Sequence, residues 1–364
     1  MKNKLVRLIS ILMLLILAIG ACAPAQSEGG AESTESLAST DAQSTEVQTE
    51  EQTTEAATTE ADTSDVVYID RPEKKVKNLL LIGNSFCYYF TEELYAIAAA
   101  DGYELNVANL YESGCPVADH WAWLNSGAKN YTFFYVSKKY NGMRREYKVD
   151  TVQGALDFAK NELGVDWDVI SLQQHFYPSL ALKYSSALQS TAPYAKKLYD
   201  RIRAEHPDSK LVWHQTWAYE VGYAVPEKYV GEPKNDTAIP DVATQTATYE
   251  TIAKVSKEVA EQNGVNIIPC GDAWQVARAD SRVGDTMCKR LGVNGDLGDY
   301  YHDGDVGGGQ YLNACVWYEA LTGNSCIGNT WRPRNYKLSE EKIIALQEAA
   351  HKAVAEMYGP GYAK

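Results

Sequence analysis

The feature that most constrains the fold of this chain is an unbroken apolar run, Leu79–Ile82, that ends abruptly in Gly83-Asn84-Ser85. A run of Leu and Ile without alternation is typical of a strand buried on both faces, as in a parallel sheet. A serine directly after such a strand lies at the carboxyl edge of the sheet, where open α/β folds place their sites. Ser85 is therefore a candidate nucleophile, although a plain turn between strand and helix would explain the same residues.

The segment after Ser85 adds to this interpretation. We predict a helix over Thr91–Ala100, whose N-terminus would place backbone N–H groups and a positive dipole end beside Ser85 Oγ. A nucleophile whose reaction passes through an oxyanion needs that environment.

Strand-like and helix-like runs alternate along the rest of the chain. The strand-like runs are 79–83, 104–110, 168–173, 210–216 and 265–269, and the helix-like runs include 192–205, 246–263 and 339–358. Such alternation implies a parallel sheet with helices on both faces. We therefore predict an α/β fold, a three-layer α/β/α sandwich with a mainly parallel, flavodoxin-like sheet. Residues 67–364 are enough for one large domain of this kind.

One segment, 128–147, interrupts the alternation. It is aromatic and basic, and it is typical of a β-hairpin that turns at Asn141-Gly142. We predict a small hairpin insertion there and place it near the site.

A second group of candidate residues lies far downstream, where Asp299 stands three residues before His302. That spacing lets the carboxylate reach the imidazole N–H, fix its tautomer and stabilise the imidazolium. Lone Asp–His pairs are common, but here the glycines 307–309 lead into an apolar helix, Tyr311 to near Gly323. The pair would then lie on a loop held by a packed helix.

Gly-x-Ser near the start of the domain and Asp-x-x-His near its end resemble the first and last sequence blocks of the SGNH (GDSL-like) hydrolases. The resemblance implies that Ser85 is the nucleophile, His302 the general base and Asp299 the carboxylate that orients it, with no cofactor. It also matches Gly114 to the glycine of the second block, so that the backbone N–H groups of Ser85 and Gly114 would bind the oxyanion.

The third block departs from the superfamily pattern. Where the superfamily has Gly-x-Asn-Asp, this chain has Gln173-Gln174 at the end of a predicted strand. A Gln can replace Asn as the side-chain donor to the oxyanion, and either of the two could do so. His175 is a third candidate.

The runs 167–174, 211–219, 267–273 and 311–323 look like those of an uncharacterised SGNH-type domain family found in bacterial lipoproteins and glycan-utilisation settings. The resemblance implies a serine esterase that removes acetyl or other small acyl esters from carbohydrates. Residues that could contact such a substrate are Asn84, His120, Trp121, His175, Trp217 and Tyr219. Aromatic faces suit stacking on sugar rings, although core packing explains each aromatic residue as well.

Other interpretations remain open. A catalytically inactive, glycan-binding lipoprotein on the same scaffold would explain the Gln-Gln block, and hydrolysis of a lipid or thioester would need a wider apolar groove. A metal site built from His120, His175 and His214 has no supporting ligand spacing, so we predict none. The sequence shows neither a basic patch nor a zinc or helix-turn-helix pattern, which disfavours nucleic acid as a partner.

The N-terminus has the pattern of a processing signal. Lys2, Lys4 and Arg7 precede an apolar stretch, Leu8–Ile19, that is too short for a comfortable membrane span. Residues 19–22 then resemble a bacterial lipobox ending in Cys22. We predict a lipoprotein signal peptide over 1–22, with lipid attached to Cys22, and an extracytoplasmic location on the bacterial cell membrane. An ordinary secretory signal is the alternative.

Residues 23–66 form the predicted linker between this anchor and the domain. Residues 23–65 contain Ser, Thr, Glu, Gln and Ala without Lys or Arg, and their eleven acidic residues account for most of the net charge of −14. Such a segment has too little apolar surface to fold and should be disordered. Six cysteines follow Cys22. Of these, Cys87 and Cys115 are expected to pack as small buried residues.

Overall fold

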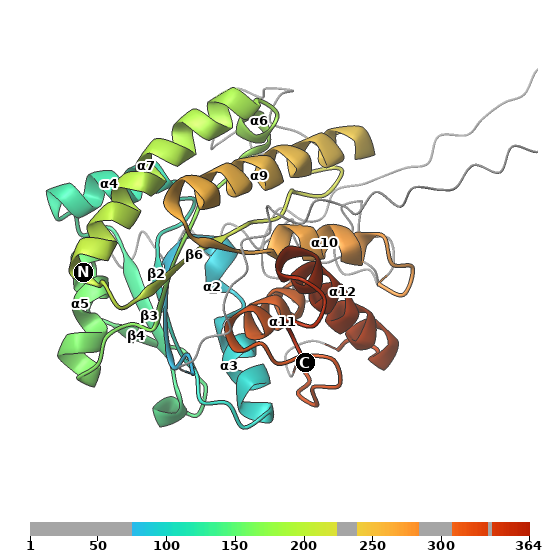
Figure 1. Ribbon diagram of the computed structural model, residues 1–364, viewed down its shortest axis with the longest axis horizontal. Helices are drawn as coiled ribbons and strands as arrows, with labels where there is room; N and C mark the ends of the chain where they lie inside the picture. Colours follow the sequence, from blue (N-terminus) through green and yellow to red (C-terminus); the bar gives the residue numbers. More distant parts are fainter. Residues whose placement is uncertain (1–74, 224–238, 284–307, 334–336) are drawn as a thin grey trace, which may run out of the picture. The chain divides into compact units, whose positions relative to one another are not determined.

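The structure is a computed structural model that describes residues 75–223, 239–283, 308–333 and 337–364 (Figure 1). The predicted signal peptide with Cys22, the predicted linker, and the catalytic candidates Asp299 and His302 lie outside the described residues. No helix in the described ranges is long and apolar enough to cross a membrane.

Seven strands form one sheet in the order β4-β3-β2-β1-β5-β6-β7. Their bounds are β1 Asn78–Gly83, β2 Asn106–Tyr111, β3 Thr132–Val136, β4 Arg145–Tyr147, β5 Val169–Gln173, β6 Lys210–His214 and β7 Asn266–Ile268. Neighbours from β2 to β7 pair in parallel, whereas β3 and β4 are antiparallel additions at one edge. The five parallel strands have the flavodoxin-like order, which confirms the predicted fold class.

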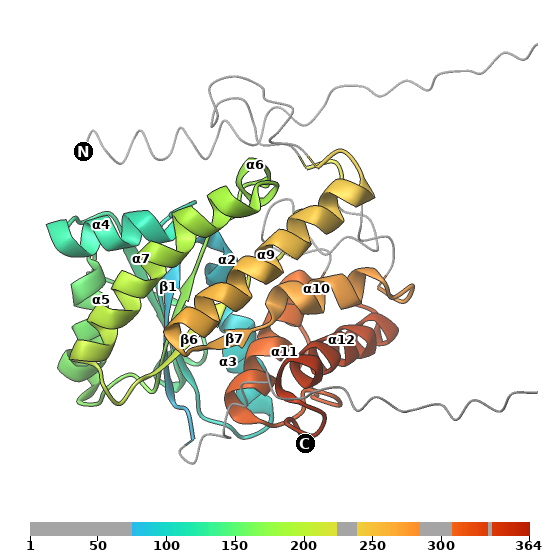
Figure 2. The same cartoon turned by 45° about the horizontal axis from the view of Figure 1, so that its top comes forward.

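Helices cover both faces of the sheet (Figures 1 and 2). One face carries α2 Ser85–Tyr88, α3 Thr91–Ala100, α10 Cys270–Arg278, α11 Gly309–Thr322 and α12 Glu340–Tyr358. The other carries α4 Val117–Ser126, α5 Val152–Phe158, α7 Tyr184–Glu205 and α9 Val242–Asn263. Shorter helical pieces are η1 Lys138–Tyr140, η2 Ala159–Leu163 and α6 Pro178–Ala181.

The central strand β1 is buried on both faces, as its sequence predicts. Leu79 and Leu81 pack with the α3 and α11 side, while Leu80 and Ile82 pack with the α4, α5 and α7 side. None of the four side chains is more than 1% exposed. Burial of each contributes about 1.5–3 kcal/mol, so this strand anchors both layers of the core.

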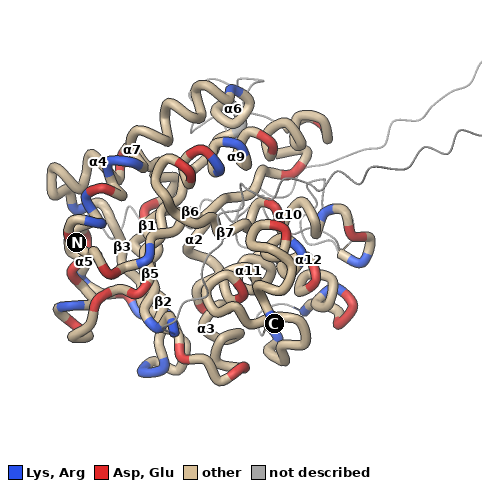
Figure 3. Tube along the Cα trace, in the orientation of Figure 1, with Lys and Arg blue, Asp and Glu red and all other residues tan. Residues whose placement is uncertain are grey.

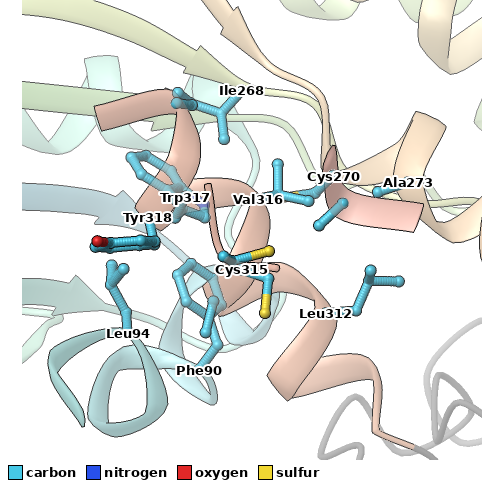
Figure 4. Packing of buried hydrophobic residues seen from close by; sticks show 14 of the residues in the cluster. Phe90, Leu94, Ile268, Cys270, Ala273, Leu312, Cys315, Val316, Trp317 and Tyr318 are labelled. Carbon is cyan, nitrogen blue, oxygen red and sulfur yellow. The ribbon is translucent and has the colours of Figure 1, made fainter. Parts of the chain in front are cut away.

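Helix α11 occupies the centre of one layer. Every residue from Gly309 to Leu321 is buried. Trp317 stacks on Phe90, the residue before α3, with ring centres 6.0 Å apart, and Figure 4 shows Tyr318 beside Leu94 of α3. The predicted apolar helix is therefore confirmed. The candidates Asp299 and His302 precede this fully packed helix in the sequence.

The predicted hairpin is also confirmed. β3 and β4 pair antiparallel, and the turn between them contains Asn141 and Gly142, both with positive φ (54° and 74°). The turn contacts the α2–α3 region, because Arg144 donates to Glu92 and lies 3.9 Å from the ring centre of Tyr88. The five cysteines within the described residues are all buried and free, including Cys87 and Cys115.

Candidate active site at the carboxyl edge of the sheet

The turn after β1 is built around the side chain of Asn84. Its Oδ1 accepts from Phe86 N at 3.1 Å, and its Nδ2 donates to Cys115 O at 3.0 Å. The first bond caps α2, and the second ties the β1 turn to the loop after β2. Ser85 is the first residue of α2 and is 8% exposed.

One expectation about this turn needs correction. The predicted helix Thr91–Ala100 exists as α3, but it is not the helix that begins at Ser85. A separate single turn, α2, stands between them, because the Asn84 cap starts helical backbone at once. The Thr91 end of α3 has no side-chain cap.

Gln173 supports the turn from the neighbouring strand β5. Its Nε2 donates to Asn84 Oδ1 at 2.5 Å, and its Oε1 has no hydrogen-bond partner in the described structure. A Cβ at Gly83 would lie 2.7 Å from Gln173 Cγ and 2.9 Å from Cys87 Sγ. Gly83 is therefore required for close packing of β1 against the Gln173 side chain.

Gln174 is held in a different way. Its Oε1 accepts from Val117 N at 2.8 Å, which satisfies one of the free N–H groups at the start of α4. No described residue accepts a hydrogen bond from Gln174 Nε2. The amide is thus fixed through its oxygen, and its nitrogen donates to no described residue.

Gly114 and His175 form the next part of the edge. Gly114 has a left-handed φ of 64°, and its carbonyl accepts from His175 Nδ1 at 3.2 Å. His175 Nε2 accepts from Tyr219 OH at 3.1 Å, so both ring nitrogens are occupied. Burial lowers the pKa of His175 to about 4, and the ring is neutral near pH 7. His175 therefore holds the Gly114 loop.

These residues meet where the chain order of the sheet reverses. β1 pairs with β2 on one side and with β5 on the other, so the carboxyl ends of β1 and β5 flank the switch point. Open α/β sheets bind ligands at this crevice. Ser85 follows β1, Gly114 follows β2, and Gln173 ends β5. Among the described residues, none accepts a hydrogen bond from the backbone N–H of Ser85 or Gly114.

Most of the predicted substrate contacts are instead buried. His120 and Asn84 are 0% exposed, Trp217 is 2% exposed and Tyr219 is 1% exposed. Trp217 stacks on Trp274 with ring centres 4.4 Å apart. Burial leaves these side chains no open face for a sugar ring, and here core packing is the better interpretation.

Two of the predicted contacts lie on α4: His120, which is buried, and Trp121, which is only partly buried. His120 Nδ1 pairs with Tyr131 OH at 2.6 Å beneath α4. Trp121 faces α7, where Lys197 lies 5.8 Å from its ring centre. These positions result from the α4 helix, which the sequence analysis did not identify.

The three histidines considered for a metal site each contact different residues. His120 packs on Tyr131, His175 bridges Gly114 and Tyr219, and His214 lies against Phe90 and Trp317. Within the described ranges, no group of three or more His, Cys, Asp or Glu side chains is arranged to hold a metal ion.

The buried histidines give a prediction about acid stability. Burial lowers the pKa of His120 and His214 to about 3 and that of His175 to about 4. Below pH 6.5 the unfolded chain binds more protons at these residues than the folded one, so stability falls as the pH falls from about 6.5 to 4. Each histidine contributes about 1.4 kcal/mol per pH unit.

Urea unfolding at pH 7, 6 and 5 checks this prediction. Burial raises the pKa of Asp272 and Glu319, and these groups oppose the effect, so the net slope should lie below the three-histidine limit. His175→Gln should flatten the dependence. A protein that is equally stable at pH 7 and pH 5 would contradict the assignment of neutral buried imidazoles.

The structure adds aromatic residues near Ser85 that the sequence analysis did not select. Tyr88, three residues after Ser85, contacts Tyr111 at the end of β2 with ring centres 4.8 Å apart. Arg144 of the hairpin lies over the Tyr88 ring. The aromatic and basic composition of 128–147 was a signal for this contact, but only the tertiary structure identifies its partners.

The fold and the site define a doubly wound α/β protein with a serine beside its topological switch point. Residues 78–353 match a protein family described as a domain of unknown function, DUF4886. A DUF4886 protein from Bacteroides uniformis is 30% identical, with a TM-score of 0.60, and the similarity covers 78% of this chain and 96% of that one. The chain belongs to the DUF4886 family, which confirms the prediction of an uncharacterised domain family.

Two further solved structures are more distant. A protein from Slackia heliotrinireducens, provisionally described as an SGNH hydrolase, is 17% identical with a TM-score of 0.37, over 67% of this chain and 98% of that one. A protein from Parabacteroides merdae, provisionally described as a GDSL-like lipase, is 13% identical with a TM-score of 0.36, over 69% and 97%. Both likenesses are too weak to support an argument. No curated protein matches the chain.

Proposed function

We propose that this protein is a serine esterase of SGNH type, with Ser85 as its nucleophile. The observation that carries the proposal is the position of Ser85 at the β1/β5 switch point, with two backbone N–H groups on neighbouring loops that no described residue accepts from. Such donors stabilise the oxyanion that forms when a hydroxyl attacks an ester carbonyl. The Gly-x-Ser and Asp-x-x-His motifs support the same assignment.

In the proposed mechanism, Ser85 Oγ attacks the ester carbonyl carbon while His302 accepts the hydroxyl proton. His302 then gives this proton to the departing alcohol, and an acyl-serine remains. A water molecule attacks the acyl-serine, with His302 again as base, and the acid and free serine are released. Asp299 orients His302 and stabilises its charged form. The backbone N–H groups of Ser85 and Gly114 would bind the oxyanion in both steps.

The third oxyanion donor in this proposal is Gln174. Its oxygen is anchored by Val117 N, and its nitrogen makes no hydrogen bond to a described residue. Gln173, in contrast, uses its nitrogen to hold Asn84, and we assign it the positioning of the Ser85 turn. No step in this mechanism calls for a cofactor.

For the substrate we propose a small acyl ester, most simply an acetyl ester, on a carbohydrate. The proposal rests on the resemblance of the motifs to domains from glycan-utilisation settings. Hydrolysis of p-nitrophenyl acetate followed by a panel of acetylated glycans tests it. Turnover of the chromogenic ester without release of acetate from any glycan would reject the carbohydrate substrate. Saturable glycan binding without any turnover would favour the inactive binding protein.

We further propose that the protein is anchored to the outer face of the bacterial cell membrane through lipid on Cys22. The basic, apolar and lipobox pattern of residues 1–22 supports this location. Cys22→Ser should prevent lipid attachment and shift the protein from the membrane fraction to the medium or the soluble fraction. Fractionation with immunoblotting measures the shift, and Cys288→Ser is the control. Membrane retention of Cys22→Ser without lipid would show that another element is the anchor.

A further inference from the structure

A separate cavity of about 570 Å³ lies along the edge of the sheet formed by β7. In the sheet order, β7 is separated from the Ser85 strand by β5 and β6. The cavity is lined by α9 on one side, by the last turn of α12 on the other and by β7 itself, and Figure 2 shows β7 close to these two helices. Its volume is in the range of small-molecule sites.

The walls of this cavity, which we call the β7 cavity, are mostly apolar. The α9 side presents small side chains at helical spacing, with Ala253 and Ala260 one above the other. Ile267 contributes from β7, Val265 contributes from the residue before it, and Met357 contributes from α12. The small residues on α9 leave the space that a larger side chain would fill.

A carboxylate, Asp272 in the first turn of α10, lines the β7 cavity. Gln215, which is 2% exposed, holds it twice: Gln215 Oε1 accepts from Asp272 N at 3.0 Å, and Gln215 Nε2 donates to Asp272 Oδ1 at 2.8 Å. Tyr249 OH also donates to Oδ1, at 2.9 Å. These bonds fix the orientation of the carboxylate.

All the hydrogen bonds that the described residues donate to this carboxylate go to Oδ1, and none goes to Oδ2. Asp272 is only partly buried and Oδ2 is not among the buried atoms that lack a partner, so this oxygen is open to water or to the donor group of a ligand. Asp272 therefore offers one oriented acceptor oxygen to whatever enters the cavity.

The charged groups around the cavity favour a cationic ligand. Glu356 lines the cavity with Asp272, and its negative charge adds to burial in raising the pKa of the Asp272 carboxyl. Of the two lysines at the rim, Lys254 lies 4.0 Å from the ring centre of Tyr184, and Lys257 pairs with Glu261 at 3.6 Å. Figure 3 shows both signs interspersed along α9.

We propose that the β7 cavity binds an organic ammonium ion, a primary amine whose charged end pairs with Asp272 Oδ2 and whose apolar body lies between α9 and α12. This site goes beyond the proposed esterase function and does not depend on it. An ammonium group supplies both the donor and the positive charge that the held carboxylate lacks. The small α9 residues would contact the apolar body.

Isothermal titration of the purified protein at pH 7.5 with benzylamine and with its neutral counterpart benzyl alcohol tests the site. We expect saturable binding of benzylamine with a Kd roughly 10- to 100-fold below that of benzyl alcohol. Asp272→Asn should remove most of this difference. Asp200→Asn, which removes an exposed carboxylate on α7, should leave it unchanged.

Equal affinity for the amine and the alcohol, or an unchanged Kd for benzylamine in Asp272→Asn, would overturn the proposal. So would the absence of benzylamine binding to the unsubstituted protein. If Asp272→Asn does not fold, Ala253→Phe decides, because it fills the cavity and leaves the carboxylate in place. Loss of benzylamine binding in that variant supports the β7 cavity as the site, and retained binding excludes it.

Discussion

Ser85→Ala should lower kcat for a small acetyl ester by roughly 10⁴- to 10⁶-fold, because the attacking oxygen is removed. His302→Ala should cause a loss of the same order. The double variant should be scarcely slower than either single variant, since nucleophile and base act as one unit. Asp299→Asn should cost less, because Asp299 orients the base and does not react. Steady-state hydrolysis of p-nitrophenyl acetate by the four variants measures these effects.

The control for this series is Ser126→Ala, which removes an exposed hydroxyl at the end of α4. Its activity should equal that of the unsubstituted protein. Thermal unfolding should show that Ser85→Ala remains folded, since no described residue hydrogen bonds to Ser85 Oγ. Full activity of Ser85→Ala would mean that the protein is not a serine hydrolase of this kind.

The pH dependence of the same reaction separates His302 from His175 as the base. With His302 as base, the rate should rise with pH through an apparent pKa of about 6.5, the ordinary value for imidazole. Burial lowers the pKa of His175 to about 4, so a reaction that used His175 would already be near its plateau at pH 6. The hydrogen bonds of both His175 nitrogens also argue against His175 as the base.

The sheet could be predicted from the sequence because its strands are buried on both faces. Leu79–Ile82 has no polar residue to place towards water, so only the centre of a parallel sheet accommodates it. The observed β1, β2, β5, β6 and β7 lie within a few residues of the predicted runs. Hydrophobic pattern and fold depend here on the same side chains, which is why the agreement is close.

Helix boundaries depend on interactions that local sequence does not contain. The predicted helix begins at residue 192, next to Pro193, a residue type that is typical of a first helical turn. In the structure α7 begins at Tyr184 and continues through Pro193. The additional turns bury Ala187 and pack near α6 and α9. Tertiary burial therefore outweighs the loss of one backbone hydrogen bond at the proline.

The nature of the site could be predicted only in part. Ser85 was selected because it follows a strand, and Gly114 because it matches the glycine of the second sequence block. Topology brings the ends of the neighbouring strands β1 and β2, which precede them, together. Trp217 follows a strand in the same way, yet it stacks on Trp274 in the core. The sequence shows that a residue lies near the sheet edge, but the direction of its side chain is set by packing partners that are distant in sequence.

The pair Gln173-Gln174 illustrates the same limit, and the structure turns it into a sharp experiment. Gln173 is the last residue of β5 and Gln174 follows the strand, so the two adjacent amides have different surroundings. Gln173 Nε2 donates to Asn84, whereas Gln174 accepts from Val117 N through its oxygen. The proposed oxyanion donor, Gln174, is therefore held through its side-chain oxygen. A glutamate at this position would still have that oxygen and could accept the same hydrogen bond.

Gln174→Glu should lower kcat by roughly 10²- to 10³-fold with little change in KM and little loss of stability. The glutamate still accepts from Val117 N, but once ionised it cannot donate to an oxyanion, and its charge opposes the one that develops. The matched variant Gln173→Glu should behave differently, because its carboxylate would face Asn84 Oδ1 with no proton between the two oxygens. That variant should lose stability as well as activity, by about 1–3 kcal/mol for the broken buried hydrogen bond.

Measuring kcat, KM and urea stability for both variants separates a donor from a positioning residue. If Gln174→Glu is fully active, the third donor lies elsewhere, and the two backbone N–H groups would have to act without this amide. If instead Gln173→Glu is stable and loses only kcat, the two roles are reversed. A catalytic loss without a stability loss can arise only at the amide whose donor hydrogens face the reacting ester, because the other amide already uses a donor hydrogen to hold the Ser85 turn.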